Sequence, residues 1–128
     1  MIVVYGIKEQ LNPIKSKLSD VIHLSMTQAI GMPEDKRAHR FVPMEKEDFY
    51  YPGGRTDAYT VIEINMMEGR QKKTKKLLIK TLFNNIESQL GISSVDIEIT
   101  IKEQPAHCWG FRGITGDEAQ DLKYQVKV

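Results

Sequence analysis

The sequence predicts an α+β fold in which duplicated β-α-β units form a four-stranded mixed sheet with two helices on one face. The main observation is a repeat: an apolar strand, an amphipathic helix, a glycine and another strand occur twice, about sixty residues apart. A second observation is that apolar residues recur at helical spacing before each of these glycines. Residues of the two copies match in pairs at this offset: Ile2 with Ile62, Lys15 with Lys75, Leu18 with Leu78, and Gly31 with Gly91.

The bulk composition limits the classes of function. The chain has 128 residues, a net charge of +1 and one cysteine, which fits a single domain over residues 1–128 without an internal disulfide. Nearly balanced charge argues against a protein that binds nucleic acid mainly through phosphates. No apolar run reaches the ~20 residues that span a bilayer, and the start lacks the pattern of a signal peptide. We therefore expect a cytoplasmic protein without membrane or nucleic-acid partners.

The first repeat unit occupies residues 1–45. Residues 2–7 are nearly all apolar, which predicts a strand covered on both faces. Asn12 can cap a helix and the proline after it suits a first turn, so we predict a helix over residues 13–30. The glycine that follows favours the left-handed conformation that ends helices. A second strand is predicted around residues 41–42.

The second repeat unit occupies residues 59–116. A strand is predicted around residues 61–64, and leucine and isoleucine at four-residue spacing predict a helix over residues 72–90. From Val95 to Ile101 apolar and polar residues alternate, which predicts a strand with one apolar and one polar face. The glycines after this strand indicate a short hairpin.

The remaining segments are a loop and a tail. Residues 45–58 are acidic, aromatic and rich in glycine, which indicates an ordered loop with one turn of helix. This loop could cover the site as a lid or fill a contact between subunits. Residues 117–128 form a polar tail. The second face of the sheet would expose Val, Ile or Met side chains, so we expect a symmetric oligomer in which sheets pack against each other.

Three motifs of the second unit carry a family resemblance. They are Met67-Glu68-Gly69-Arg70 after the third strand, Ser94-Val95 with Ile99-Thr100 in the fourth strand, and Cys108-Trp109-Gly110-Phe111-Arg112-Gly113 after it. In this order and spacing they resemble the short subunit of the 4-oxalocrotonate tautomerase family. The double-length chain is similar to the malonate semialdehyde decarboxylase-like branch of the tautomerase superfamily. The resemblance implies a tautomerase (MIF-like) fold that assembles as a homotrimer.

The chain departs from the family pattern at three functional positions. Family chemistry depends on an amino-terminal proline, whereas this chain starts with Met1, so a primary α-amine stands at that position. The decarboxylase-like branch pairs two arginines after the third strand, where this chain has Arg70 and, in place of the other arginine, Glu68. The branch also has an aspartate after the first helix, where Lys36 stands here, beside Asp35.

The resemblance implies a site of five residues. Met1 and Arg70 are the expected catalytic residues, and Trp109, Phe111 and Lys36 are expected to bind the substrate. An α-amine has a reference pKa near 8, and an apolar pocket or nearby cations would lower it. Arg70 lies between a strand and a helix, where its guanidinium and the backbone N–H groups of the helix start can bind a carboxylate.

Two functions fit these features. The first is keto–enol tautomerisation, or related proton transfer, on a small carboxylate ligand such as an α-keto or enol acid. The second is a non-catalytic trimer of the tautomerase fold that binds a small anion or a partner. A lysine cluster at residues 72–76 also fits an interaction surface, although such clusters are more often only solvated. His23 and His39 show no ligand spacing, so we expect no metal and no other cofactor.

Overall fold

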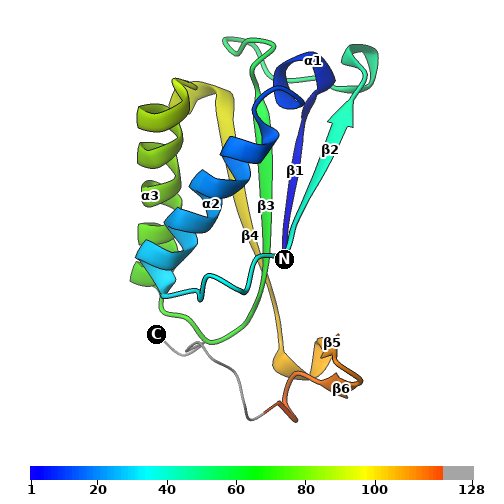
Figure 1. The fold of residues 1–128 in the computed structure, drawn as a ribbon, viewed down its shortest axis with the longest axis vertical. Helices are drawn as coiled ribbons and strands as arrows, with labels where there is room; N and C mark the ends of the chain where they lie inside the picture. The colour runs from blue at the N-terminus through cyan, green and yellow to red at the C-terminus, as the bar shows by residue number, and fades with distance from the viewer. Residues whose placement is uncertain (120–128) are drawn as a thin grey trace.

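The computed structural model describes residues 1–119, whose largest element is a four-stranded sheet (Figure 1). The strands are β1 (Ile2–Ile7), β2 (His39–Met44), β3 (Thr60–Met67) and β4 (Ile97–Gln104). They lie in the order β2-β1-β3-β4. β1 is parallel to β2 and antiparallel to β3, and β3 is parallel to β4. The predicted mixed four-stranded sheet is therefore confirmed.

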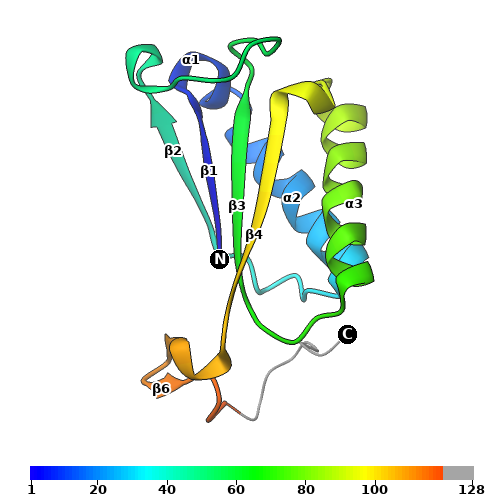
Figure 2. The same ribbon diagram turned by 180° about the vertical axis from the view of Figure 1, so that it is seen from behind.

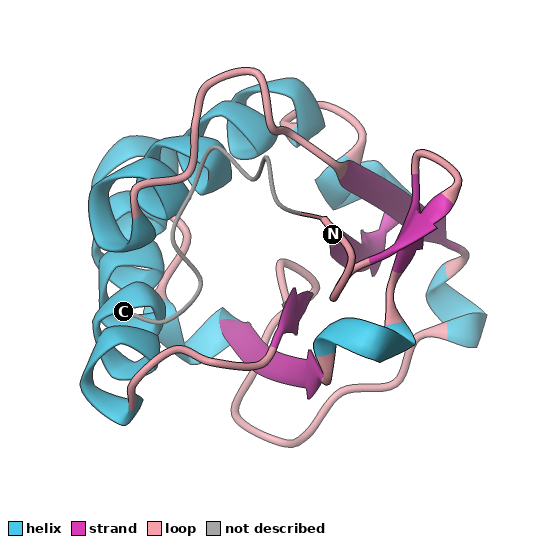
Figure 3. Cartoon of the chain, turned by 90° about the horizontal axis from the view of Figure 1, so that it is seen from below, coloured by secondary structure: helices cyan, strands magenta, loops and turns pink. Residues whose placement is uncertain are grey.

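Two long helices cover one face of this sheet. They are α2 (Lys15–Ile30) and α3 (Lys72–Leu90), and Figures 1 and 2 show both on the same side of the strands. Seen from below, the helices border one side of the molecule (Figure 3). Each helix ends at a glycine in the left-handed region, Gly31 with φ 69° and Gly91 with φ 70°. This conformation is unfavourable for residues with a Cβ atom, which explains the two glycines.

The start of the first long helix was predicted wrongly. A short helix, α1 (Lys8–Leu11), directly follows β1, and Asn12 lies at its carboxyl end instead of capping α2. The backbone N–H of Asn12 donates to the carbonyl of Lys8 at 3.0 Å. The extra turn places Leu11 in the core, where its side chain is almost fully buried. Burial of this leucine therefore outweighs the local preference of asparagine for a helix start.

The start of β4 also differs from the prediction. Val95 lies in a 3-10 helix, η2 (Ser94–Asp96), and is 59% exposed. The carboxylate of Asp96 is buried and accepts hydrogen bonds from the N–H and the hydroxyl of Thr56, both at 2.7 Å. This connection turns Asp96 inward, so the predicted alternation begins only at Ile97.

The core lies between the helices and the sheet. It is made of side chains that project from alternate positions of the strands and from one stripe of each long helix. The largest members that are almost fully buried are Val4, Leu11, Leu18, Ile22, Ile62, Ile64, Leu78, Leu82 and Ile86. Each such side chain contributes about 1.5–3 kcal/mol through removal from water.

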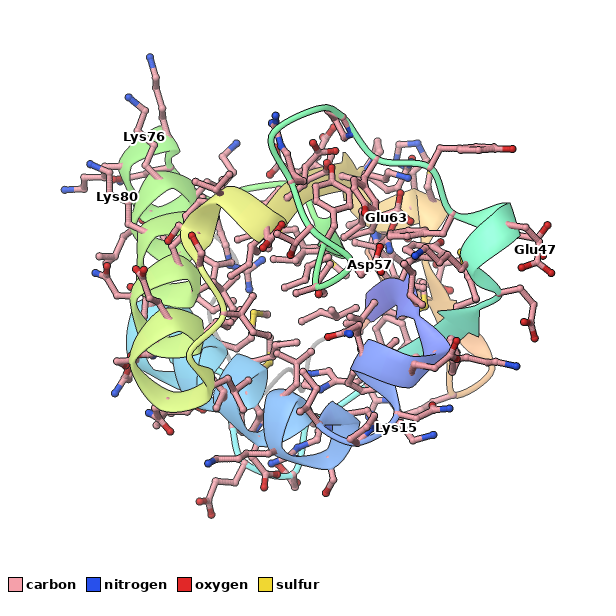
Figure 4. The ribbon with its side chains drawn as sticks, turned by 90° about the horizontal axis from the view of Figure 1, so that it is seen from above. Lys15, Glu47, Asp57, Glu63, Lys76 and Lys80 are labelled. Atoms are coloured by element: carbon pink, nitrogen blue, oxygen red, sulfur yellow. The ribbon has the colours of Figure 1, made fainter. Side chains whose placement is uncertain are left out.

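The face of the sheet without helices carries both apolar and charged side chains. It contains valines of three strands: Val3, Val42 and Val61. Opposite Val3 on β3 lies Glu63, the centre of a polar group, which is labelled in Figure 4. The carboxylate of Glu63 accepts hydrogen bonds from the Tyr5 hydroxyl at 2.8 Å and from the Lys102 ammonium at 2.9 Å. The expected valines of several strands are therefore present, and a charged pair that was not predicted lies beside them across β3 and β4.

The connecting loop contains the expected turn of helix, η1 (Lys46–Asp48). It joins the end of β2 to the start of β3, so it lies at the end of the sheet away from Met1 (Figure 1). Tyr51 packs against Tyr59 with ring centroids 5.8 Å apart, and its hydroxyl donates to Asp57 at 2.6 Å. The loop is thus ordered, and it does not cover the end of the sheet at which Met1 lies.

The predicted hairpin after β4 is present. A 3-10 helix, η3 (Ala106–Cys108), leads into β5 (Gly110–Phe111) and β6 (Ile114–Thr115), which pair antiparallel. Figure 1 shows this hairpin beyond the end of the sheet at which the chain starts. Of the predicted polar tail, residues 120–128 lie outside the described residues.

Candidate active site

A cavity of about 570 Å³ lies at the end of the sheet where β1 and β2 begin and β3 ends. The end of α2, the segment that leads into α3, and the hairpin complete its walls. All five residues predicted for the site line this cavity: Met1, Lys36, Arg70, Trp109 and Phe111. The topology thus collects residues from both repeat units, while the roles expected for them stay predictions.

The Met1 amino group is fixed against the end of β3. It donates a hydrogen bond to the Asn65 carbonyl at 2.9 Å, and the Met1 carbonyl accepts one from the Asn65 N–H at 2.8 Å. Although 42% of Met1 is exposed, its amino group is covered enough to lose solvation. Burial, and then the positive charges of Arg40 and Arg70, lower the pKa of this amino group below its ordinary value of 8.0. More of the amine is therefore neutral near pH 7, and the neutral amine is the form that accepts a proton.

Arg70 reaches the cavity from the turn between β3 and α3. Gly69 precedes it with φ 136°, a conformation that only glycine adopts readily, and α3 begins two residues later. Arg70 is only 6% exposed, and its Nη1 lies 3.7 Å from the Met66 sulfur. A guanidinium in such a dry site interacts strongly with a carboxylate, because it offers two parallel N–H donors.

Further cations line the cavity that were not predicted. Arg40 extends from β2, and Arg112 follows Phe111 in the hairpin, with its guanidinium 5.3 Å from the centre of the Phe111 ring. Arg37 also lines the cavity and forms an ion pair with Asp20 at 2.6 Å. The spacing of Arg40 in the sequence gives no signal, because its place depends on the pairing of β2 with β1.

The aromatic wall comes from the hairpin. Trp109 and Phe111 are both partly buried and line the cavity, as predicted. The indole Nε1 of Trp109 is buried and has no hydrogen-bond partner among residues 1–119. Close packing holds this turn, because the backbone of Gly116 approaches Ala106 and the Met67 side chain too closely to admit a Cβ atom. The wall is therefore placed by backbone packing and not only by the aromatic side chains.

Comparison with known proteins agrees with this site. The sequence profile of a family described as tautomerase enzyme matches residues 36–112, more than half of the chain. The chain belongs to the tautomerase family. Probable tautomerase YusQ of Bacillus subtilis (strain 168) is 31% identical, over 74% of this tautomerase-family chain and 79% of the relative. The 2-hydroxymuconate tautomerase of Comamonas testosteroni is 29% identical, over 44% of the chain and 89% of the relative.

Solved structures share the fold of this tautomerase-family member. A fused 4-OT, solved as an asymmetric trimer, superimposes with a TM-score of 0.79 and 25% identity, over 91% of this chain and 95% of that one. A malonate semialdehyde decarboxylase gives a TM-score of 0.78 with 20% identity, over 87% and 89% of the two chains. The tautomerase superfamily and the fold predicted from the sequence are therefore confirmed.

Two histidines of this tautomerase-family chain meet at the cavity although their spacing gave no sign of it. They are His23 on α2 and His39 on β2. The centroids of their rings are 6.0 Å apart, and the rings lie edge to face. Burial, followed by the charge of Arg37, the neighbouring histidine and the Met1 amino group, lowers the pKa of His39 to about 4. At neutral pH His39 is therefore an uncharged imidazole that can donate one hydrogen bond and accept another.

Two further features concern the described part of this tautomerase-family chain. Within residues 1–119, no three His, Cys, Asp or Glu side chains come close enough together to hold a metal ion. None of the helices described there combines the length and apolar composition that crossing a bilayer requires.

Figure 4 shows Lys76 and Lys80 projecting from α3 away from the sheet, so they contribute nothing to the cavity.

Proposed function

We propose that this protein catalyses keto–enol tautomerisation of a small α-keto or enol acid. The observation that carries the proposal is that the Met1 amino group and the Arg70 guanidinium lie at one cavity with an aromatic wall. Membership of the tautomerase family supports this class of reaction.

In the proposed reaction the neutral Met1 amine removes a proton from the carbon next to the carbonyl of the keto acid. The electron pair of the broken C–H bond forms the carbon–carbon double bond, and the carbonyl oxygen becomes an enolate. The Met1 ammonium then gives its proton to that oxygen, which yields the enol and restores the neutral amine, and the reverse sequence returns the ketone. A positioned base of suitable pKa can perform this transfer without a cofactor, and the lowered pKa of the Met1 amine supports that role.

Arg70 is proposed to hold the carboxylate or the enolate oxygen. Its buried guanidinium would stabilise the negative charge that develops as the proton leaves. Trp109 and Phe111 are proposed to exclude water, which strengthens such interactions. Lys36 is exposed at the edge of the cavity, where its charge would attract anionic substrates.

We also propose a homotrimer as the working assembly. One face of the sheet has no helix over it, and Val42 there is 38% exposed. The fused 4-OT of the same fold was solved as a trimer. Packing of this face against second and third copies would cover Val42 and the partly buried Val3 and Val61.

The test follows the ketonisation of phenylenolpyruvate by the loss of its ultraviolet absorbance. Three forms are compared: the native protein, the Nα-acetylated protein, and a form with proline inserted after Met1. We expect activity in the native protein and a loss of at least 100-fold after acetylation, because an amide nitrogen does not accept the proton. If the acetylated protein is equally active, Met1 is not the base. If only the proline form is active, the natural protein is an anion-binding member of the family.

A matched pair of arginine variants tests the second catalytic residue. Arg70→Ala should lower kcat/KM by about 10²–10³, the range for removal of a group that stabilises an oxyanion. Arg55→Ala serves as the control, because Arg55 is exposed in the loop at the other end of the sheet, where it donates to the Gly53 carbonyl. Equal activity of the two variants would contradict the role of Arg70.

A further inference from the structure

The proposed proton transfer leaves one buried polar side chain of the cavity without a role. His23 lines the cavity from α2 and is only 4% exposed. Both of its ring nitrogens are buried, and neither has a hydrogen-bond partner among residues 1–119. A buried polar group without a partner destabilises the fold, and native structures contain few of them. A ligand in the cavity that supplies the missing hydrogen bond would account for this histidine.

The histidine next to His23 is uncharged at neutral pH and takes part in a hydrogen-bond chain. The Nδ1 of His39 lies 2.8 Å from the Ser19 hydroxyl oxygen, which itself accepts a hydrogen bond from Arg37 at 3.4 Å. The Ser19 proton is then available for Nδ1, and in the arrangement where Ser19 donates it, Nε2 of His39 carries the ring proton and can donate to a ligand. The charge of Arg37 is offset by its ion pair with Asp20. The two histidines therefore offer hydrogen bonds from uncharged rings, while the remaining cations of the cavity, Lys36, Arg40 and Arg112, lie on other parts of its lining.

The surroundings of the two histidines indicate the rest of the ligand. Apolar side chains of α2 and β3 line the cavity beside them, among them Met26, Ile30 and Met66. The cavity of about 570 Å³ falls in the range of pockets that hold ligands much larger than a three-carbon acid. A carbon skeleton would contact these apolar side chains, with one polar group at Arg70 and another at the histidines.

We propose that His23 and His39 form a subsite for an uncharged oxygen, a hydroxyl or a carbonyl, of a ligand whose carboxylate lies at Arg70. The inference rests on the proposed function and narrows its substrate to keto or enol acids with a second, uncharged oxygen. A second carboxylate fits the two histidines poorly, since the cations that would attract it, Lys36, Arg40 and Arg112, belong to other parts of the lining. It would lose its hydration among apolar side chains, and the uncharged His39 supplies one donor and no positive charge.

Calorimetric titration with unreactive acids of matched shape tests the proposal. The probes are 3-phenylpropanoate, its 3-hydroxyphenyl and 4-hydroxyphenyl analogues, and 3-(4-carboxyphenyl)propanoate. We expect the native protein to bind the better hydroxylated acid about tenfold more tightly than 3-phenylpropanoate, the effect of one added hydrogen bond. The dicarboxylate should bind more weakly than that hydroxylated acid.

Variants of α2 separate ligand binding from stability. His23→Leu should abolish the preference for the hydroxyl group while the Tm does not fall, because leucine fills a similar volume without an unpartnered polar atom. His23→Gln, which keeps a donor and an acceptor, should retain part of the preference. Ser25→Ala is the matched control: this buried serine of α2 is outside the cavity lining and bonds with Asn85 and Val21. It should lower the Tm and keep the full preference.

Three results would overturn the subsite: equal binding of the hydroxylated and plain acids, tightest binding of the dicarboxylate, or an unchanged preference in His23→Leu. Absence of binding by all four acids would overturn the subsite together with the carboxylate site at Arg70. Because binding is measured without turnover, failure of the proposed catalysis is recognised separately. A native protein that prefers the hydroxylated acid but does not tautomerise phenylenolpyruvate would retain the subsite and lose the enzymatic function.

Discussion

Arg40 and Arg70 lie close enough to the Met1 amino group to disfavour its protonated form. Arg70 is buried, whereas Arg40 is exposed at the start of β2. Replacement of Arg70 and replacement of Arg40 should affect different properties of the site. Loss of Arg70 would change substrate binding and the amine together, whereas loss of Arg40 changes mainly the electrostatics of the amine. Arg40 is therefore the better position at which to test whether the lowered pKa matters.

Arg40→Gln should move the pH dependence of kcat/KM to higher pH. Removal of a positive charge favours the ammonium form, so the pKa of the Met1 amine rises toward its ordinary value of 8.0. The base is active only above its pKa, so the rising limb of the pH profile should shift upward while the rate at high pH changes little. Steady-state rates between about pH 5 and pH 9 measure this shift. Arg55→Gln should leave the profile in place, and an unmoved limb in Arg40→Gln would show that another group is the base.

At the scale of elements, the contact between η2 and the connecting loop fixes the start of β4. Asp96 is buried, and its two carboxylate oxygens accept from the N–H and the hydroxyl of Thr56, forty residues away in the sequence. This single contact joins the loop before β3 to the turn before β4. It explains why a residue expected on a solvated strand face is inside the molecule.

Thr56→Val should lower the free energy of unfolding by about 1–3 kcal/mol, because one oxygen of the buried Asp96 carboxylate loses its donor while the volume of the side chain is kept. Denaturant titration of the folded protein measures the change. The control is Thr100→Val, which makes the same threonine-to-valine change at an exposed position of β4. It should change the free energy of unfolding by less than about 0.5 kcal/mol. Equal effects of the two substitutions would mean that the Asp96 contact contributes little.

At the scale of the whole molecule, the uncovered sheet face and the outer surface of α2 offer a matched comparison. Val42 on the sheet face is 38% exposed and Leu24 on α2 is 39% exposed. The proposed trimer buries the first and leaves the second in water. Val42 and Leu24 are thus equally exposed in the single chain, but in the proposed trimer only Val42 would be removed from water.

Val42→Glu should convert the proposed trimer into monomers, because a carboxylate without a partner is costly to bury in an interface. Light scattering coupled to size-exclusion chromatography measures the mass of each species. Leu24→Glu should leave the mass unchanged. Loss of assembly in both variants, or in neither, would contradict an interface on the sheet face.

The fold was predictable where the signals are local. Gly31 and Gly91 end their helices because each residue itself adopts the left-handed conformation, so its identity carries the information. Asn12 misled the prediction because the gain from burying Leu11 depends on tertiary packing, which no local signal reports.

The candidate site was predictable only in part, for a related reason. Motifs near Arg70 and Trp109 identified residues that do line the cavity. The meeting of His23 with His39, by contrast, depends on the parallel register that places His39 opposite Ile2. Neither histidine has a sequence neighbour that indicates this register.

The position of β1 inside the sheet has a consequence for synthesis of the chain. β1 precedes the other strands in the chain, yet its two neighbours are β2, which begins at His39, and β3, which ends at Met67. At roughly 5–20 residues per second, translation takes on the order of several seconds to reach that point. Until Met44 has been synthesised this strongly apolar strand lacks both partners, and until Met67 has been synthesised it still lacks one of them. Unpaired apolar segments of this kind aggregate readily. Rapid translation of the first half of the chain, or a chaperone bound to the emerging strand, should therefore raise the yield of folded protein.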